Sequence, residues 1–210
     1  MKEILYILLF VPFGLFGQNS LDELMGTSSL NDGLLMYYPF NGNTDDISGN
    51  NLHGEPINVE LTSNRFGTPN SAYNFDYDPT PYGEQGDEVF IPYSPIMNSE
   101  FLTVSLWLKP FEYNWNGNSD YSVIINRYQF GYDDPPGEHW NLLFNSDFIR
   151  VGINTNIYGS DFLFDYHYSL ALNEWHHIVF TYNQENLIIY INGELGAETS
   201  YSGVLNQDGL

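Results

Sequence analysis

Residues 173–197, N-E-W-H-H-I-V-F-T-Y-N-Q-E-N-L-I-I-Y-I-N-G-E-L-G-A, decide the fold class of this chain. Two runs of β-branched and aromatic residues with a period of two, 175–182 and 187–191, flank a short polar turn, and this pattern is typical of strands. The pair Asn192–Gly193 tolerates the positive φ angles that a type I′ hairpin turn requires. The stretch therefore predicts an antiparallel meander, and its two largely apolar faces place it between the layers of a sandwich.

Other alternating runs predict further strands, bounded by turn residues. They are residues 33–42, 57–62, 88–92, 101–109, 121–127, 139–145 and 148–154, the last two forming a hairpin around Ser146 and Asp147. Pro39 restricts the first of these strands to an edge or a strand end, because proline cannot donate a ladder hydrogen bond. Residues 155–172 are rich in Tyr and Phe and receive no assignment.

The meander resembles the W-H-x-(V/I/A)-x-x-Y … L-x-(L/I)-Y-(V/I)-N-G pattern of laminin-G-like domains, which belong to the concanavalin A-like lectin/glucanase superfamily. The matching residues are Trp175, His176, Tyr182, Leu187, Tyr190, Asn192 and Gly193. Residues 101–109 and the Arg65-Phe66-Gly67 segment are similar to two further motifs of the family. The resemblance implies an all-β, two-sheet antiparallel jelly-roll sandwich that spans residues 34–210.

The charge balance is strongly acidic, with 5 Lys and Arg against 27 Asp and Glu and a net charge of −22. Such a field repels polyanions, so nucleic acids and anionic membrane surfaces are poor partners. The acidity itself has two interpretations, the solubility of an exported protein and divalent cation binding at a few carboxylates. The absence of cysteine excludes a disulfide scaffold, a thiolate metal site and a cysteine nucleophile.

The beginning of the chain has the pattern of an export signal. Residues 1–17 hold an apolar run that is too short for a comfortable membrane span and has the length of a signal-peptide core. We expect cleavage near Gly17 and Gln18, with a retained anchor helix as the alternative, and we assign residues 18–33 to a linker. These features predict a secreted or cell-surface protein that is not inserted in the membrane after signal removal.

The end of the sequence differs from the family pattern. Laminin-G-like domains normally continue after the Asn-Gly turn with an I-G strand and a final D-D-(V/I)-R-(V/I)-Y strand, and residues 194–210 contain neither motif. The resemblance therefore implies a domain that is C-terminally truncated here and belongs to a larger multidomain protein.

A loop rich in oxygen ligands follows the first predicted strand. Residues 43–54, N-T-D-D-I-S-G-N-N-L-H-G, supply the hard donors that Ca²⁺ prefers, without the spacing of an EF-hand. The segment is similar to the D-x-S-G-N motif of laminin-G-like domains, and the resemblance implies Asp46 as a calcium ligand, with Asn50 and Asp45 as weaker candidates. The alternative is a metal-free loop closed by side-chain hydrogen bonds.

Two other loops carry exposed aromatic candidates for ligand recognition. Trp115 stands between two Asn residues in loop 111–120, where an indole can stack on a sugar ring or pack over a sheet edge. Tyr132 and Asp133 lie in a second acidic, aromatic loop. We predict these three residues as ligand-binding residues because recognition residues concentrate on loops that a rigid scaffold positions.

The sequence contains no catalytic signature that we can identify. Glucanases of this fold carry an E-x-D-x-(x)-E strand for a retaining mechanism, and that motif is absent. His176 and His177 are adjacent on a predicted strand, so they point to opposite faces and cannot chelate one metal together. We therefore predict a non-catalytic binding or adhesion module for carbohydrate or an extracellular protein, with a glycoside hydrolase or lyase, or a structural spacer, as alternatives.

Overall fold

The computed structural model describes residues 33–75, 86–113, 122–128, 138–155 and 162–205. Within them the only helix is the short 3-10 helix η1 (Pro95–Met97), and all strand pairs are antiparallel. The all-β prediction is therefore confirmed. The proposed signal peptide, 1–17, and all of the linker 18–33 except Gly33 lie outside the described residues. No helix in the described ranges has the length and apolarity to cross a membrane.

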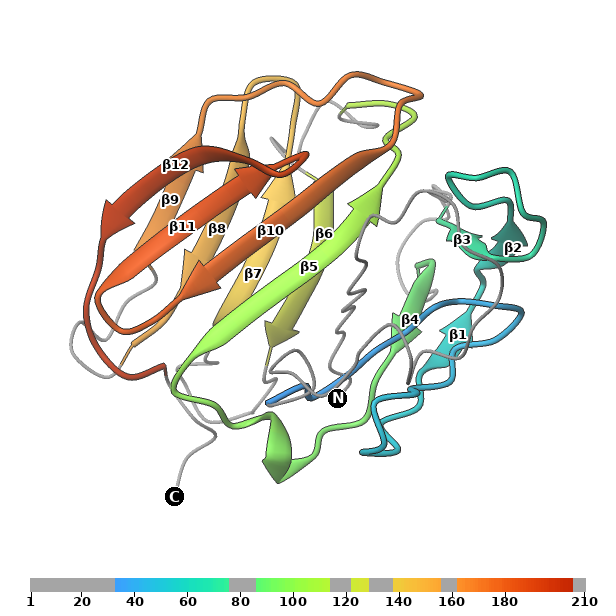
Figure 1. The fold of residues 1–210 in the computed structure, drawn as a ribbon, viewed down its shortest axis with the longest axis horizontal. Coiled ribbons are helices and arrows are strands. Elements are labelled where there is room, and N and C mark those ends of the chain that lie inside the picture. The colour runs from blue at the N-terminus through green and yellow to red at the C-terminus, as the bar shows by residue number, and fades with distance from the viewer. Residues whose placement is uncertain (1–32, 76–85, 114–121, 129–137, 156–161, 206–210) are drawn as a thin grey trace.

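One four-stranded sheet, which we call the front sheet, contains the predicted meander (Figure 1). Its strands follow the order β12 (Glu194–Ser200), β11 (Asn186–Ile191), β10 (His176–Tyr182) and β5 (Leu102–Leu108). Asn192 and Gly193 join β11 to β12 with φ angles of 53° and 85°, as the type I′ prediction requires. The meander prediction is confirmed.

The second four-stranded sheet, the back sheet, lies behind the first in Figure 1. Its strands are β6 (Ser122–Tyr128), β7 (Glu138–Phe144), β8 (Ile149–Ile153) and β9 (Phe162–Tyr166), paired in chain order. The predicted hairpin around Ser146 and Asp147 is confirmed as β7 and β8. β9 falls in the stretch that received no assignment from the sequence.

The core lies between the two sheets and takes one side chain in two from each central strand. From the front sheet, Ile178, Phe180 and Tyr182 of β10 are buried, and the Phe180 ring meets Trp140 of β7 edge-on at 5.8 Å. Further buried members are Val104, Leu106, Ile125, Leu142, Val151, Ile153, Leu187 and Ile189. Each fully buried aliphatic or aromatic side chain contributes about 1.5–3 kcal/mol.

Two short strand pairs lie beside the β5 edge of the sandwich (Figure 1). β1 (Glu55–Ile57) pairs with β4 (Glu88–Phe90), and β2 (Glu60–Thr62) pairs with β3 (Ala72–Asn74). The single strand predicted over 57–62 is therefore wrong. Asn58 has a φ of 58°, which breaks the run into β1 and β2.

The strand predicted over 33–42 is also wrong, although its alternation is real. Met36 and Tyr38 are buried, yet no strand is assigned between residues 33 and 54. Backbone groups of this segment bond to the side chains of the following loop rather than to a strand. Ser48 and Asn50 donate to the Leu35 carbonyl at 3.0 and 2.9 Å.

We predict that Phe180→Ala lowers the free energy of unfolding by about 3–5 kcal/mol, because a cavity forms between the sheets. Phe101→Ala is the control, since that ring is 58% exposed, and its effect should be within about 0.5 kcal/mol. Urea denaturation of the purified chain measures both. Equal effects of the two substitutions would contradict the placement of Phe180 in the core.

Candidate functional site

The Asp46 carboxylate organises loop 43–54. It is 5% exposed and accepts backbone N–H hydrogen bonds from Tyr37, Ser48 and Leu52 at 3.0, 2.9 and 3.0 Å. The Ser48 hydroxyl donates a fourth bond at 2.9 Å. A carboxylate has about four lone-pair positions, so these four donors use its acceptor capacity.

These hydrogen bonds keep Asp46 ionised. Burial by itself would raise the pKa of the carboxyl, but the backbone donors of Tyr37, Ser48 and Leu52 and the Ser48 hydroxyl outweigh burial and lower the pKa. The negative charge is therefore held inside the loop by fixed dipoles, without a cationic side chain.

The other predicted calcium ligands turn away from Asp46. The Asn50 amide donates to the carbonyls of Leu34 and Leu35, and the exposed Asp45 accepts a bond from Asn43 at 2.6 Å. In the described part of the chain, no three His, Asp or Glu side chains converge as a metal site. The loop as arranged does not fit a cation. Calcium binding by this loop stays a prediction. The arrangement of loop 43–54 in the structure is that of the alternative, a metal-free loop closed by side-chain hydrogen bonds.

The predicted recognition residues Trp115, Tyr132 and Asp133 lie outside the described residues. The strands that flank them are described: Trp115 precedes β6, and Tyr132 and Asp133 connect β6 to β7.

The back sheet presents a polar surface on the side opposite the core. Its inward residues Ile125, Leu142 and Val151 are fully buried against the front sheet, and alternate positions lie on the opposite side. A register shift in β6 between Val123 and Ile125 places Val123 on that side too. Exposure there ranges from buried side chains, Asn141 and Leu143, to exposed ones, Val123 and Leu163. We call the positions on that side the polar face: Val123, Asn126, Asn141, Leu143, Arg150, Gly152, Leu163 and Asp165. The registers arrange them in two rows, Asn126–Asn141–Gly152–Leu163 and Val123–Leu143–Arg150–Asp165.

The first row places amide groups at the middle of the polar face. The side-chain oxygen of Asn141 accepts the Gly152 N–H at 3.1 Å, and the Asn141 amide lies so close that a Cβ at position 152 would stand 2.6 Å from it. A Cβ at position 152 would therefore displace the Asn141 amide. Asn126, the partner of Asn141 on the adjacent strand, is half-buried.

The second row contains a bidentate ion pair. Arg150 donates from Nε and Nη2 to the two Asp165 oxygens at 2.6 and 2.8 Å, and both side chains are partly exposed. The hydrogen bonds from Arg150 lower the pKa of Asp165, against the opposing effect of burial, and the charges of Arg150 and His167 lower it further. The Arg150 guanidinium and the Asp165 carboxylate, held by their mutual hydrogen bonds, thus lie on the same face as the amides of Asn126 and Asn141.

Sequence reasoning missed this face for an identifiable reason. The alternation of residues 148–154 already puts Arg150 and Gly152 on the side opposite Ile149, Val151 and Ile153. Without β9, however, nothing in the sequence pairs Arg150 with Asp165. The Tyr- and Phe-rich pattern of 162–166, F-L-F-D-Y, was the available signal for that strand.

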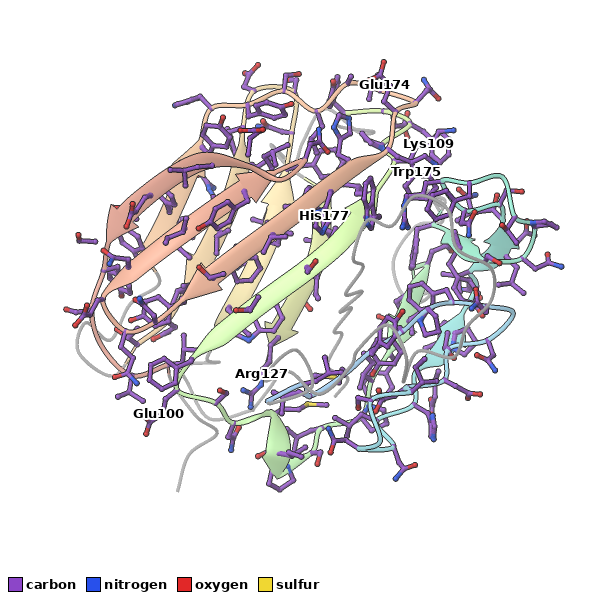
Figure 2. The ribbon with its side chains drawn as sticks, viewed as in Figure 1. Glu100, Lys109, Arg127, Glu174, Trp175 and His177 are labelled. Carbon is purple, nitrogen blue, oxygen red and sulfur yellow. The ribbon has the colours of Figure 1, made fainter. Side chains whose placement is uncertain are left out.

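A second cluster lies on the outer face of the front sheet, where Figure 2 labels His177. The imidazole stacks on Trp107 with ring centroids 5.0 Å apart, and its Nε2 lies 2.8 Å from the Ser105 hydroxyl oxygen. The Arg65 guanidinium lies 4.4 Å from the Trp107 ring. Burial, and then the Arg65 charge, lowers the pKa of His177.

This cluster is structural rather than catalytic. Ser105 is 4% exposed, and no carboxylate pairs with His177 in the described residues, whereas an acyl-transfer triad needs an accessible nucleophile and an oriented base. His176 points to the core side with 4% exposure, and its Nε2 lies 3.0 Å from the Ala171 carbonyl. The prediction that the two histidines face opposite sides is confirmed.

A sequence profile of the laminin G type, that of the concanavalin A-like lectin/glucanases superfamily, matches residues 83–209, more than half of the chain. No curated protein matches the sequence significantly.

Solved structures with a similar fold are distant from this chain. They include domain 4 of AbnA, a GH43 extracellular arabinanase from Geobacillus stearothermophilus in complex with arabinotriose, at 18% identity and TM-score 0.40, covering 80% of this chain and 78% of that one. Domains LG4-5 of the mouse laminin α1 chain match at 14% identity and TM-score 0.34, covering 50% of this chain. The match spans only 26% of the laminin structure.

We predict that Asp46→Ala lowers the free energy of unfolding by about 3–5 kcal/mol, because three buried or partly buried N–H groups and the Ser48 hydroxyl lose their acceptor. The neighbouring Asp45→Ala is the matched control and should have little effect, since Asp45 is exposed. Thermal melts of both variants and the parent chain, with excess Ca²⁺ and with chelator, measure the change.

The same melts separate the two interpretations of the loop. The hydrogen-bonded arrangement predicts equal midpoints with Ca²⁺ and with chelator. A chelator-sensitive midpoint that disappears in Asp46→Ala would instead establish a calcium site there.

We predict that His177 makes stability depend on pH. Because its pKa is lowered in the folded state, its stabilising effect is complete above the ordinary value of 6.5 and is lost as the pH falls below it. Urea denaturation between about pH 7.5 and pH 5 should show a smaller decline for His177→Gln than for the parent chain. His167→Gln, at an exposed position, is the control. Equal declines in the two variants would refute the role of His177.

Proposed function

The chain belongs to the concanavalin A-like lectin/glucanases superfamily, and from this premise we propose that it is an exported, non-catalytic module that binds carbohydrate. The polar face of the back sheet is the observation that carries the proposal. It combines the half-buried amide of Asn126 with the partly exposed Arg150–Asp165 pair on one four-stranded sheet, next to the buried amide of Asn141.

The chemistry of this face suits a sugar. A sugar ring carries hydroxyl groups that both donate and accept hydrogen bonds, and amides, carboxylates and guanidinium groups supply complementary partners. The exposed Leu163 and Val123 border these groups and can contact the apolar C–H surface of a ring. Four strands span about 14 Å, the scale of a short oligosaccharide.

The state of the carboxyl groups supports binding rather than hydrolysis. A glycosidase needs a general acid whose pKa is raised, placed beside a second carboxylate. Asp46 and Asp165 are the described carboxyls with a resolved shift, and in both the pKa is lowered by hydrogen bonds. Each is therefore held as a carboxylate rather than as a proton donor, and of the two only Asp165 lies on the polar face, where it can accept hydrogen bonds from a ligand.

The recognition residues predicted from the sequence, Trp115, Tyr132 and Asp133, are proposed as further ligand contacts. An extracellular protein partner is the alternative ligand, and a structural spacer would bind neither. Both alternatives are outcomes of the experiment below.

We predict that the purified chain binds at least one member of a panel of soluble polysaccharides in affinity electrophoresis, and that Asn126→Ala weakens this binding. Loss of hydrogen bonds from one amide should reduce affinity roughly 5- to 10-fold. Trp115→Ala should reduce it at least as much if the indole stacks on the sugar.

The matched control is Asn186→Ala, which removes an amide from the front sheet and should leave binding unchanged. Binding to no glycan, with capture of one defined extracellular protein, would overturn the carbohydrate proposal. The acidic cluster Glu84, Asp87 and Glu88 supplies the carboxylates that the hydrolase or lyase alternative would use. Glycan cleavage that Glu84→Gln or Glu88→Gln abolishes would replace the binding proposal with that alternative.

A further inference from the structure

The described arginines are already engaged, and one of them lies on the polar face. Arg150 is held by Asp165 through two hydrogen bonds. Arg127 is buried and donates to the Met97 carbonyl at 2.9 Å, and Arg65 lies over the rings of Phe66 and Trp107. The polar face therefore carries one positive charge, which a carboxylate neutralises at contact distance.

The rest of the protein adds a strong negative field to this neutral face. The chain holds 27 Asp and Glu against 5 Lys and Arg, so a polyanion approaching any surface meets net repulsion of long range at low salt. A ligand carboxylate would have to displace Asp165 from Arg150, and both Asp165 oxygens hold that guanidinium. An anionic sugar thus gains no charge pair to offset the repulsion.

An uncharged sugar meets neither obstacle. The Asp165 carboxylate uses two of its about four acceptor positions on Arg150, and the remaining ones can accept hydrogen bonds from sugar hydroxyls. Because the ion pair fixes both side chains, these acceptors are positioned before the ligand arrives.

We infer that the ligand is an uncharged glycan and that the Arg150–Asp165 pair sets this preference, an inference that rests on the carbohydrate-binding function proposed above. Asp165 acts as a specificity-determining residue, since it both neutralises the cation that would attract an acidic sugar and accepts bonds from neutral ones.

The test compares uncharged polysaccharides (arabinan, xylan and mixed-linkage glucan) with acidic ones (polygalacturonate and alginate), using affinity electrophoresis of the purified chain. The inference predicts that the chain binds at least one uncharged polysaccharide with an affinity that does not change with salt concentration. It predicts no binding to the acidic polysaccharides at low or high salt. Binding of an acidic member in preference to all uncharged ones would overturn the inference and leave the carbohydrate-binding proposal intact.

Two variants with the same change of charge sharpen the test. Asp165→Asn releases Arg150 on the polar face and should raise the affinity for polygalacturonate roughly fivefold, an effect that high salt removes. The same substitution should lower the affinity for the uncharged polysaccharide. Asp147→Asn, in the exposed turn between β7 and β8, should change neither. Equal behaviour of the two variants would show that the pair does not set the preference.

The parent chain alone distinguishes the remaining outcomes, even if Asp165→Asn fails to fold. Binding of no polysaccharide of either kind overturns the proposed function and this inference together. Binding of uncharged and acidic polysaccharides with equal affinity overturns only the inference.

Discussion

Burial of the inward side chains of β10 against the back sheet is the interaction on which the structure depends. Ile178, Phe180 and Tyr182 fill the space between the layers, and Phe180 meets Trp140 directly. Because strand side chains alternate, this burial also fixes which residues of the back sheet face solvent. The polar face is thus a consequence of core packing. Asn141, Arg150 and Gly152 lie on the outer side of the back sheet because the adjacent residues, Leu142 and Val151, are buried in the core.

The N-terminal part of the chain is held by a different force. Residues 33–54 have no assigned strand, so their backbone groups need other partners. Asp46 supplies them, accepting three backbone N–H bonds, while Ser48 and Asn50 donate to backbone carbonyls. A buried carboxylate is stable here because fixed dipoles solvate it, as its lowered pKa indicates. The same side chain that resembles a calcium ligand therefore serves as a hydrogen-bonding centre.

Local patterns in the sequence predicted the central meander and the β7–β8 hairpin, whereas the candidate site needed long-range pairing. The meander around Asn192–Gly193 and the 146–147 hairpin follow from period-two alternation and turn chemistry, which act within a few residues. The break between β1 and β2 depends on the positive φ of Asn58. Asparagine can adopt a positive φ but does not require it, so the residue type alone does not predict the break. The contact of Arg150 with Asp165 depends on the register of β9, and no local signal specifies that register.

The most direct test of carbohydrate binding on the polar face is an NMR titration that follows the side-chain amide resonances of Asn126 and Asn141. A saturating uncharged oligosaccharide should shift both amides and the Arg150 Nε–H, while the Asn50 amide in the 43–54 loop and the Asn186 amide of the front sheet stay unchanged. Shifts confined to the front sheet or to the 43–54 loop, with the polar face unaffected, would contradict the account.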